Sequence, residues 1–377
     1  MLTINAGRGG VVIVIWQMAG GLVEKGHDVA VMCDAGTELA RLKEMGVKHF
    51  PIAFSNAQRD LWAGRRALRA AFAEFRPDVV HSHSRWPSLV SMSLGRRPDI
   101  STLHAQRLTP HGSVLDRGVF RRLIGGWGRH ITVLGEPIKR MLADETGLPE
   151  DRIVVIPNSV DETRFVPPSV DARARARAMF GFSEEDVVAL FVGALLDVKR
   201  PWWCVEALAA ARARGIPARM LIVGEGQKRR DCEQMAGERG ILEHCVFAGW
   251  REDTLPAYHS ADLLMLPSEE EGFALVCVEA MLCGVPVLRT RTGGAEQQVV
   301  EAVTGWSTQP EDKEAFLAAA ISAMSDRAKL RLCGLAAREH ALARFTRART
   351  LGQIERLYHE ALETRARPRA QGVSEHR

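Results

Sequence analysis

Four glutamates within eleven residues form the densest group of side chains that could do chemistry. Glu269, Glu270 and Glu271 are consecutive, and Glu279 follows after seven intervening residues. Buried carboxylates are rare unless they are partnered, and ligands of α/β sheets bind where a strand turns into a helix. The pattern predicts either a ligand site or a solvated acidic turn that interacts favourably with a helix dipole.

The acidic turn is expected to connect a buried strand to a helix. Leu263–Leu266 predicts the strand, and the helix is expected to start near Gly272-Phe273 and to run to about Cys283. Gly284 stands where a helix stop belongs. The turn therefore lies at a helix N-terminus, where backbone N–H groups lack intrahelical partners.

This helix start could bind a phosphate. The free N–H groups of Phe273, Ala274 and Leu275 would point at an anion that fills the gap beside Glu271. The carboxylate of Glu279 could accept two hydrogen bonds from a ribose diol.

Two adjacent cations, Lys199 and Arg200, follow a strand predicted over Val187–Val192 and its terminal Gly193. Cations in such a loop suit a leaving diphosphate, whose negative charge grows as its bond to a sugar breaks. An ordinary basic surface loop is the alternative, and these residues alone leave it open.

Three histidines, His81, His83 and His104, are expected where strands of the first half end. A histidine there could contact a substrate or share a proton, and a satisfied core histidine is the open alternative. The sequence has no Asp-x-Asp pair and no His/Cys/Asp cluster with metal-ligand spacing. We therefore expect no metal-dependent mechanism.

The elements that position these residues alternate between strands and helices. Predicted strands of the first half are Asp28–Cys33, Asp78–His83, Ile100–His104, His130–Val133 and Ile153–Ile156. Predicted strands of the second half include Val187–Val192, Ala218–Val223, Cys245–Phe247 and Leu263–Leu266. Intervening helices are predicted at Val11–Glu24, Ala63–Phe75, Glu136–Thr146 and Trp202–Arg214. The alternation implies two α/β, doubly wound, Rossmann-like halves with a cleft between them, the usual place for a substrate.

Composition limits the class of protein. The chain has 377 residues, enough for two domains, and its 46% hydrophobic and 25% charged residues are globular values. A formal charge of +4 does not indicate a nucleic-acid partner. Seven scattered cysteines without a Cys-x-x-Cys pair fit a reducing cytosol. No secretory signal is evident, and the apolar run Val11–Trp16 is far shorter than the roughly 20 residues of a membrane span.

Two basic and aromatic stretches, Arg59–Arg76 and Arg117–Arg129, occur in the first half. Arginines with aromatic neighbours fit an anionic membrane surface, and a solvated arginine-rich face is the alternative. We therefore expect a cytoplasmic protein that is soluble or peripheral on the inner face of the cytoplasmic membrane. Residues 364–377 are expected to form a disordered basic tail.

These pieces resemble the GT4-type retaining glycosyltransferases of the GT-B fold, from Gly9 to about Leu362. Residues 267–287 are similar to the family signature Pro-Ser-x-x-Glu-Gly-Phe-Gly-Leu-Val…Glu-Ala-Met-x-x-Gly-x-Pro-Val, with its two glutamates at Glu271 and Glu279. Other matches are Phe191-Val192-Gly193…Lys199, Pro157-Asn158-Ser159-Val160-Asp161, Val223-Gly224-Glu225-Gly226, Gly293-Gly294-Ala295-Glu296 and Gly26-His27-Asp28-Val29. The ending from Phe345 to Leu362 is similar to the family's last helix, which crosses back to the first domain.

The resemblance implies an organisation and an activity. Residues 1–168, completed by 345–363, would form an acceptor-side domain, and residues 169–344 would bind the nucleotide sugar. A sugar would pass from a nucleotide diphosphate donor to a glycan or lipid-linked acceptor with retained anomeric configuration, as in lipopolysaccharide or exopolysaccharide synthesis. The resemblance implies no tightly bound cofactor and no metal.

The resemblance also implies roles for residues. Glu271 with the neighbouring amides would hold the donor sugar and its phosphate, Glu279 the ribose and Lys199 the diphosphate. His104 matches the family's active-site histidine, which completes a catalytic set of His104, Glu271 and Lys199. The implied donor-binding residues are Gly9, Gly10, Gly193, Lys199, Arg200, Gly272, Phe273, Ala274, Leu275, Glu279 and Glu296.

The chain departs from the family pattern at four places. Ala194 replaces a common arginine beside the diphosphate, and Val12 replaces a glutamate that follows Gly-Gly in many members. Ala274 replaces a glycine, a mild change if this residue is helical. The first strand, predicted over Met1–Asn5, is short, as expected if the natural chain begins upstream.

Two alternative functions stay open. A GT-B nucleotide-sugar 2-epimerase would use the donor without an acceptor, so an epimer formed from the donor alone would identify it. A catalytically silent family member would bind a nucleotide or a partner protein without turnover. The intact His104, Lys199, Glu271 and Glu279 argue against the silent alternative.

Overall fold

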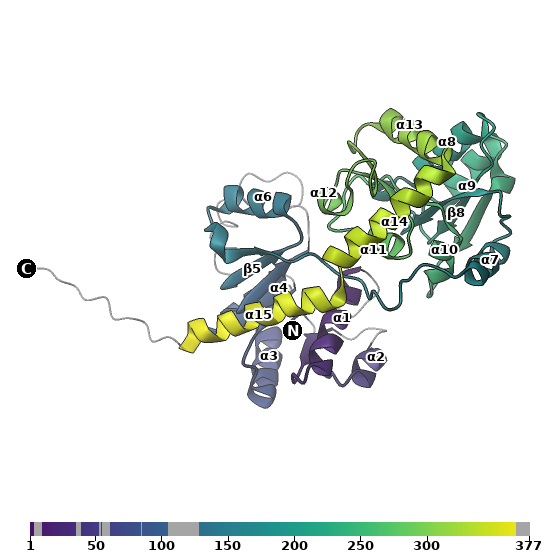
Figure 1. Ribbon diagram of the computed structural model, residues 1–377. Coiled ribbons are helices and arrows are strands. Elements are labelled where there is room, and N and C mark those ends of the chain that lie inside the picture. The colour runs from purple at the N-terminus through teal and green to yellow at the C-terminus, as the bar shows by residue number, and fades with distance from the viewer. Residues whose placement is uncertain are drawn as a thin grey trace, which may run out of the picture. The chain divides into compact units, whose positions relative to one another are not determined.

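The computed structural model describes residues 1–3, 10–34, 39–52, 54, 61–83, 85–104 and 128–366. The chain divides into two compact units. Unit 1 comprises Met1–Ile156 together with Ala348–Arg377, and unit 2 comprises Pro157–Arg347. In Figure 1, the elements from α1 to β6 and the yellow helix α15 (Arg347–Ala366) belong to unit 1, and the elements from α7 to α14 belong to unit 2.

The sheet of unit 1 is parallel wherever its pairing is described. Its strands are β1 (Ala30–Cys33), β2 (Lys48–Pro51), β3 (His81–Ser82), β4 (Ile100–Leu103), β5 (His130–Val133) and β6 (Ile153–Val155). The hydrogen-bonded orders are β1-β2 and β3-β4-β5-β6. Leu2 forms parallel bridges to Met32 of β1 and Ser82 of β3, so the N-terminal segment joins the two groups of strands. This arrangement is the expected doubly wound sheet.

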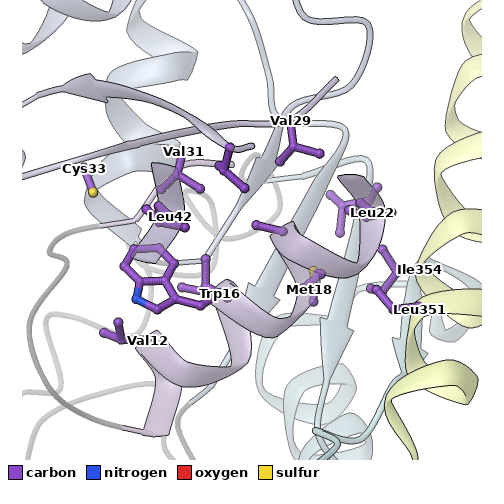
Figure 2. Packing of buried hydrophobic residues seen from close by; sticks show 14 of the residues in the cluster. Val12, Trp16, Met18, Leu22, Val29, Val31, Cys33, Leu42, Leu351 and Ile354 are labelled. Atoms are coloured by element: carbon purple, nitrogen blue, oxygen red, sulfur yellow. The ribbon is translucent and has the colours of Figure 1, made fainter. Parts of the chain in front are cut away.

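Helices cover both faces of this sheet. They are α1 (Gly10–Glu24), α2 (Leu39–Glu44), α3 (Leu61–Phe75), α4 (Arg85–Ser93), α6 (Glu136–Thr146) and α15. Side chains of a strand alternate between faces, so Val31 of β1 packs with Leu22 of α1, whereas Met32 packs with Leu68 of α3. Figure 2 shows the first of these clusters, in which Leu351 and Ile354 of α15 lie beside Met18 and Leu22 of α1.

The last helix returns to unit 1, as the sequence predicts. A Cβ added at Gly21 of α1 would lie 2.3 Å from Leu351 Cδ1, so glycine permits the close approach of α1 and α15. Glu355 of α15 pairs with Lys25 and, at 3.0 Å, with His27 just after α1. Burial of apolar surface and these exposed ion pairs hold α15 in place, and the burial contributes more of the free energy.

Unit 2 contains a six-stranded parallel sheet. Its strands are β7 (Val187–Val192), β8 (Ala218–Val223), β9 (Cys245–Gly249), β10 (Leu263–Leu266), β11 (Val287–Thr290) and β12 (Gly305–Thr308). Their order is β12-β11-β10-β7-β8-β9. This is the strand order of dinucleotide-binding sheets, in which the direction of winding reverses between the first and fourth strands, here β7 and β10. Ligands of such sheets bind outside the carboxyl ends of the strands at this switch point.

The helices of unit 2 bury both faces of its sheet. They are α7 (Val170–Met179), α8 (Pro201–Arg212), α9 (Arg229–Glu238), α10 (Leu255–Ser260), α11 (Leu275–Leu282), α12 (Ala295–Gln298), α13 (Lys313–Met324) and α14 (Arg327–Arg344). Helices α8 and α13 pack together on the sheet, and α11 packs with α14. Every residue of β7, β10 and β11 is buried, which explains why β7 and β10 are continuous apolar runs in the sequence. Strand β11 differs, because its last two residues, Arg289 and Thr290, are polar and buried.

Several predicted boundaries were wrong by a few residues. Strand β3 has two residues, whereas the sequence predicted Asp78–His83, and β2 was not predicted because Lys48–Pro51 is short and partly polar. Strands β5, β7, β8 and β10 match their predicted ranges. None of the helices in the described ranges combines the length and the apolar character that a membrane crossing requires.

Candidate functional site

Three neighbouring strands of unit 2 place the predicted donor residues at one edge of the sheet. Gly193 and Lys199 follow β7, Glu271 follows β10, and Gly293 follows β11. Because β11, β10 and β7 are adjacent and parallel, their carboxyl ends meet at the same edge. The switch point between β7 and β10 therefore lies between Lys199 and Glu271.

Lys199 and Glu271 form an ion pair across the switch point. The Lys199 ammonium donates a hydrogen bond to Glu271 Oε1, and Ser268 Oγ donates to the same oxygen at 2.9 Å. The side chains of Lys199 and Glu271 are 23% and 11% exposed. An ion pair this sheltered is screened less than a surface pair, so it orients both side chains in the free protein.

The loop that carries Lys199 is supported by the glycine-rich loop after β8. Leu195 N–H donates to Glu225 O at 2.9 Å, and Lys228 N–H donates to Leu195 O at 2.9 Å. A Cβ added at Gly224 would lie 1.9 Å from Gly193 O, so the two backbones touch. The Val223–Gly226 motif thus positions the β7 loop, which ends in a 3₁₀ turn, η3 (Asp197–Lys199).

Arg200 is held on the other side of this loop. Its guanidinium lies 5.0 Å from the centre of the Trp203 ring, pairs with Glu269 at 3.2 Å and donates to Pro310 O. These three contacts occupy the cation, so the two predicted cations differ in their surroundings. Lys199 is directed at Glu271, and Arg200 is directed at Glu269.

The helix after the acidic turn starts later than the sequence predicts. Helix α11 begins at Leu275 rather than near Gly272-Phe273, and Ala274 is its N-cap with φ 37° and ψ 73°. The expectation that Ala274 is helical, and the change from glycine therefore mild, is wrong. A left-handed backbone costs a residue with a Cβ about 1–2 kcal/mol, because the Cβ crowds the following carbonyl.

The backbone at the start of α11 is available to an anion. Within the described part of the chain, the N–H groups of Phe273, Ala274 and Leu275 donate to no protein group. Gly272 precedes them in the loop, and the helix dipole adds partial positive charge at this end. Three free N–H groups beside a lysine are suited to a phosphate.

Glu279 lies in the second turn of α11 and is half-buried. Tyr258 O–H donates to Glu279 Oε2 at 2.6 Å, and the Tyr258 side chain is fully buried against Phe165. Burial raises the pKa of Glu279 above its ordinary value, whereas the hydrogen bond from Tyr258 lowers the pKa. One carboxylate oxygen is thus engaged by the protein. Sequence reasoning missed Tyr258, whose position in a short helix, α10, gives no motif.

The loop after β11 packs directly on the acidic turn. A Cβ added at Gly293 would lie 2.3 Å from Glu271 O and 2.6 Å from Gly272 O. Glu296, in contrast, is exposed and has no hydrogen bond to the other predicted site residues in the described ranges. Two buried residues near this loop, Arg289 and Gln298, were not predicted, because neither belongs to a recognised motif.

The predicted residues of unit 1 lie at the corresponding edge of its own sheet. His83 Nδ1 lies 3.2 Å from His104 Nε2, and His81 Nδ1 lies 2.8 Å from Tyr358 O–H. Burial lowers the pKa of His104 to about 4 and also lowers the pKa of His81 and His83. The three rings are therefore uncharged at neutral pH. Both ring nitrogens of His81 are engaged, by Tyr358 O–H and, at 2.6 Å, by Thr102 Oγ1, so His81 is a satisfied core histidine.

Other predicted features of unit 1 are placed as follows. Gly10 is the first residue of α1, and Gly9 lies outside the described residues. Most of the basic stretch Arg117–Arg129 also lies outside them. A cavity of about 400 Å³ opens beside Met1, Asp28 and Asp78, and of the predicted histidines His81 lines it.

Family models match most of the chain in two parts. Residues 8–164 match the model described as Glycosyltransferase Family 4, and residues 172–340 match the model described as Glycosyl transferases group 1. The boundary between the two matches falls close to the start of unit 2 at Pro157.

Curated relatives include several D-inositol 3-phosphate glycosyltransferases. The protein of that name from Mycolicibacterium smegmatis is 35% identical over 303 residues, which cover 76% of this chain and 68% of the relative. The one from Nocardia farcinica is 35% identical over 232 residues, which cover 59% of this chain and 51% of the relative. The match thus spans only about half the length of the Nocardia relative.

A solved structure supports the fold. The crystal structure of Anabaena HepE in complex with UDP superposes with a TM-score of 0.82 over 95% of this chain and 98% of that chain, at 21% sequence identity. This likeness agrees with the parallel sheets of the two Rossmann-like units. The chain belongs to the GT4 family of glycosyltransferases and has the GT-B fold.

Proposed function

We propose that this chain transfers a sugar, with retained anomeric configuration, from a nucleoside diphosphate sugar to a glycan or lipid-linked acceptor. The observation that carries the proposal is the Lys199–Glu271 ion pair beside the free N–H groups of α11. This pair lies at the switch point of a dinucleotide-type sheet, the place where such sheets bind nucleotides. In the proposal, unit 2 binds the donor and unit 1 serves the acceptor.

Each group of the site has a part in the proposed reaction. The N–H groups of Phe273 to Leu275 and the Lys199 ammonium stabilise the diphosphate, whose charge increases as it leaves the sugar. Lys199 moves from Glu271 to the phosphate when the donor binds, and Glu271 is then free to accept hydrogen bonds from the sugar hydroxyls. The remaining oxygen of Glu279 accepts from the ribose. The leaving phosphate helps to take the proton of the acceptor hydroxyl.

His104 is the unit 1 member of the proposed catalytic set. A neutral imidazole can accept a hydrogen bond from a sugar hydroxyl or donate one to it. Because it carries no charge, it does not compete with Lys199 for the diphosphate. Replacement of His104 by alanine is therefore expected to lower turnover more than nucleotide affinity.

The relatives support a nucleoside diphosphate donor. Anabaena HepE has been solved in complex with UDP and in complex with UDP-glucose.

The experiment is a turnover assay with UDP-, GDP- and ADP-sugars, each with and without a panel of glycan and lipid-linked acceptors. The proposal predicts a glycoside with the anomeric configuration of the donor, formed only when the acceptor is present. Glu271→Ala should abolish turnover while nucleoside diphosphate binding persists, and Glu279→Ala should weaken binding. An epimer formed from the donor alone would instead identify an epimerase. Nucleotide binding with no turnover in any pair would identify a silent family member.

We also propose that unit 1 contacts an anionic membrane surface that presents the acceptor. Trp62 at the start of α3 is 71% exposed, and Arg66 and Arg69 are exposed one and two turns further on. These positions share one stripe of the helix, so an aromatic ring and two cations face the same direction. An interfacial tryptophan beside arginines is typical of membrane-surface helices.

A further inference from the structure

A buried cation lies behind the donor site. Arg289 of β11 is 0% exposed, and its guanidinium donates to Thr290 O, Thr292 Oγ1, Gly293 O and Gln298 Oε1. All four acceptors are neutral, and no carboxylate in the described ranges forms an ion pair with Arg289. The buried charge is therefore stabilised by hydrogen bonds to neutral oxygens and not by a carboxylate.

Gln298 connects this cation to the start of α11. Its side chain is fully buried, and its Nε2 donates to Phe273 O at 2.8 Å and to Ala274 O at 3.3 Å. Arginine can only donate and a carbonyl can only accept, so the orientation of the Gln298 amide is fixed by its two sets of partners. Glutamate and leucine, which have similar size, cannot offer an acceptor on one side and two donors on the other.

The two carbonyls that Gln298 holds determine where the next two N–H groups point. In a planar trans peptide, the C=O of one residue and the N–H of the following residue point in opposite directions. Gln298 binds Phe273 O, which directs the N–H of Ala274 away from it. The bond to Ala274 O directs the N–H of Leu275 in the same way.

We propose that Arg289 and Gln298 form a buried positioning pair that aims the Ala274 and Leu275 N–H groups at a phosphate of the donor. The pair acts through the backbone and touches no substrate. Arg289 also adds positive potential beneath an anion, an effect that is strong because a buried charge is poorly screened. This inference rests on the proposed donor site of unit 2.

The left-handed backbone at Ala274 explains why such a pair is needed. A residue with a Cβ is strained at φ 37°, and such strain persists only where the surrounding structure over-determines it. Two hydrogen bonds from one rigid, buried amide group provide that restraint. Without the bond to Phe273 O, the peptide before Ala274 can rotate and turn the Ala274 N–H away from the phosphate. The Ala274 carbonyl also accepts from Cys277 N–H at 3.0 Å, so the Leu275 N–H is expected to depend less on Gln298.

The test compares a nucleoside diphosphate with its nucleoside. Isothermal titration first identifies the nucleoside diphosphate that the wild-type protein binds, and the affinity of the matching nucleoside is then measured by ligand-observed NMR. Gln298→Leu and Gln298→Glu remove the two donors, whereas Gln297→Leu changes a neighbouring glutamine outside the pair and serves as the control. The pair predicts about a tenfold or greater loss of diphosphate affinity for both Gln298 variants. Nucleoside affinity should change by less than about twofold, and the control should match the wild type.

The cation is tested separately by two substitutions. Arg289→Lys keeps the charge but not the four hydrogen bonds, so it should lose less diphosphate affinity than Arg289→Met, which should lose about tenfold. If Gln298→Leu does not fold, the Gln298→Glu variant provides the test. Its carboxylate still accepts a hydrogen bond from Arg289, so this variant is expected to fold.

Two results would overturn the inference. Equal losses of diphosphate and nucleoside affinity would indicate a merely structural role, and unchanged diphosphate affinity in the folded variants would exclude a positioning role. A wild-type protein that binds no nucleoside diphosphate would instead contradict the proposed function itself, so the two failures are distinguishable.

Discussion

The phenol of Tyr258 donates a hydrogen bond of 2.6 Å to the carboxylate of Glu279, which joins α10 to the helix that starts at the donor site. This bond opposes the effect of burial on Glu279, since burial raises the pKa and the hydrogen bond lowers it. Tyr258 therefore helps to keep Glu279 ionised, the state in which it accepts hydrogen bonds from a ribose.

Tyr258→Phe should change the pH dependence of donor binding. In the wild type, affinity falls as pH decreases through the raised pKa of Glu279, because a protonated carboxyl is a weaker acceptor. Without the phenol that pKa rises further, so the fall should begin at a higher pH. Titration calorimetry with a nucleoside diphosphate sugar at a series of pH values between about 5 and 8 measures the shift of the pH at which affinity falls. Tyr358→Phe, which removes the other tyrosine hydroxyl of the chain, is the control, and identical profiles for both variants would refute this role of Tyr258.

Gly293→Ala should displace the acidic turn. The added Cβ would meet backbone oxygens of Glu271 and Gly272, which cannot move as a flexible side chain can. We expect a loss of about 1–3 kcal/mol in the free energy of unfolding and a fall in turnover of at least about tenfold.

The control for this substitution is Gly237→Ala in α9. A Cβ there would meet nothing within 4 Å, and alanine favours a helix over glycine by about 1 kcal/mol. Chemical denaturation and turnover should therefore show a protein that is at least as stable and fully active. If both alanine variants behave alike, contact between Gly293 and the acidic turn is not important.

Ala274→Gly should stabilise the protein. Glycine removes the cost of about 1–2 kcal/mol for a left-handed alanine and loses about 0.5–1 kcal/mol through the greater freedom of the unfolded chain. The expected net gain is about 0.5–1 kcal/mol in urea denaturation. Ala274→Val should be destabilising, because a β-branched residue fits this backbone less well than alanine. A glycine variant no more stable than the wild type would show that Ala274 is unstrained.

Arg66→Glu/Arg69→Glu should weaken binding to vesicles that contain anionic lipid. The wild-type protein should sediment with such vesicles, less so at high salt, because surface charges are screened. Arg230→Glu/Arg331→Glu changes the net charge equally on exposed positions of unit 2 and should sediment like the wild type. Recovery of the wild type in the supernatant with and without vesicles would remove the membrane proposal.

The parallel sheets could be predicted because their strands are buried on both faces. Val187–Val192 and Leu263–Leu266 are continuous apolar runs ended by glycine or proline, so their bounds are correct. Lys48–Pro51 could not be recognised, because an edge strand of four partly exposed residues has no periodic pattern.

Site residues that belong to a sequence motif could be predicted. Residues that reach the site only through tertiary contacts could not. The sequence indicated both Lys199 and Glu271 as site residues. Their ion pair joins residues 72 positions apart, and it could not be predicted without knowing that β7 and β10 are adjacent strands. Tyr258, Arg289 and Gln298 contact the site through buried hydrogen bonds that the linear sequence does not show. The left-handed backbone of Ala274 was not predicted either. Alanine has a high helix propensity, but the turn before α11 places this residue in a left-handed conformation.

The central claim is that Lys199, beside the N-terminus of α11, holds a nucleoside diphosphate. Titration calorimetry of the wild type, Lys199→Ala and Lys329→Ala with the same nucleoside diphosphate tests it directly, since Lys329 is an exposed lysine of α14 in the same unit. A charge-assisted hydrogen bond predicts an affinity about 10- to 100-fold lower for Lys199→Ala and unchanged for Lys329→Ala. Equal affinities of the wild type and Lys199→Ala would contradict the account.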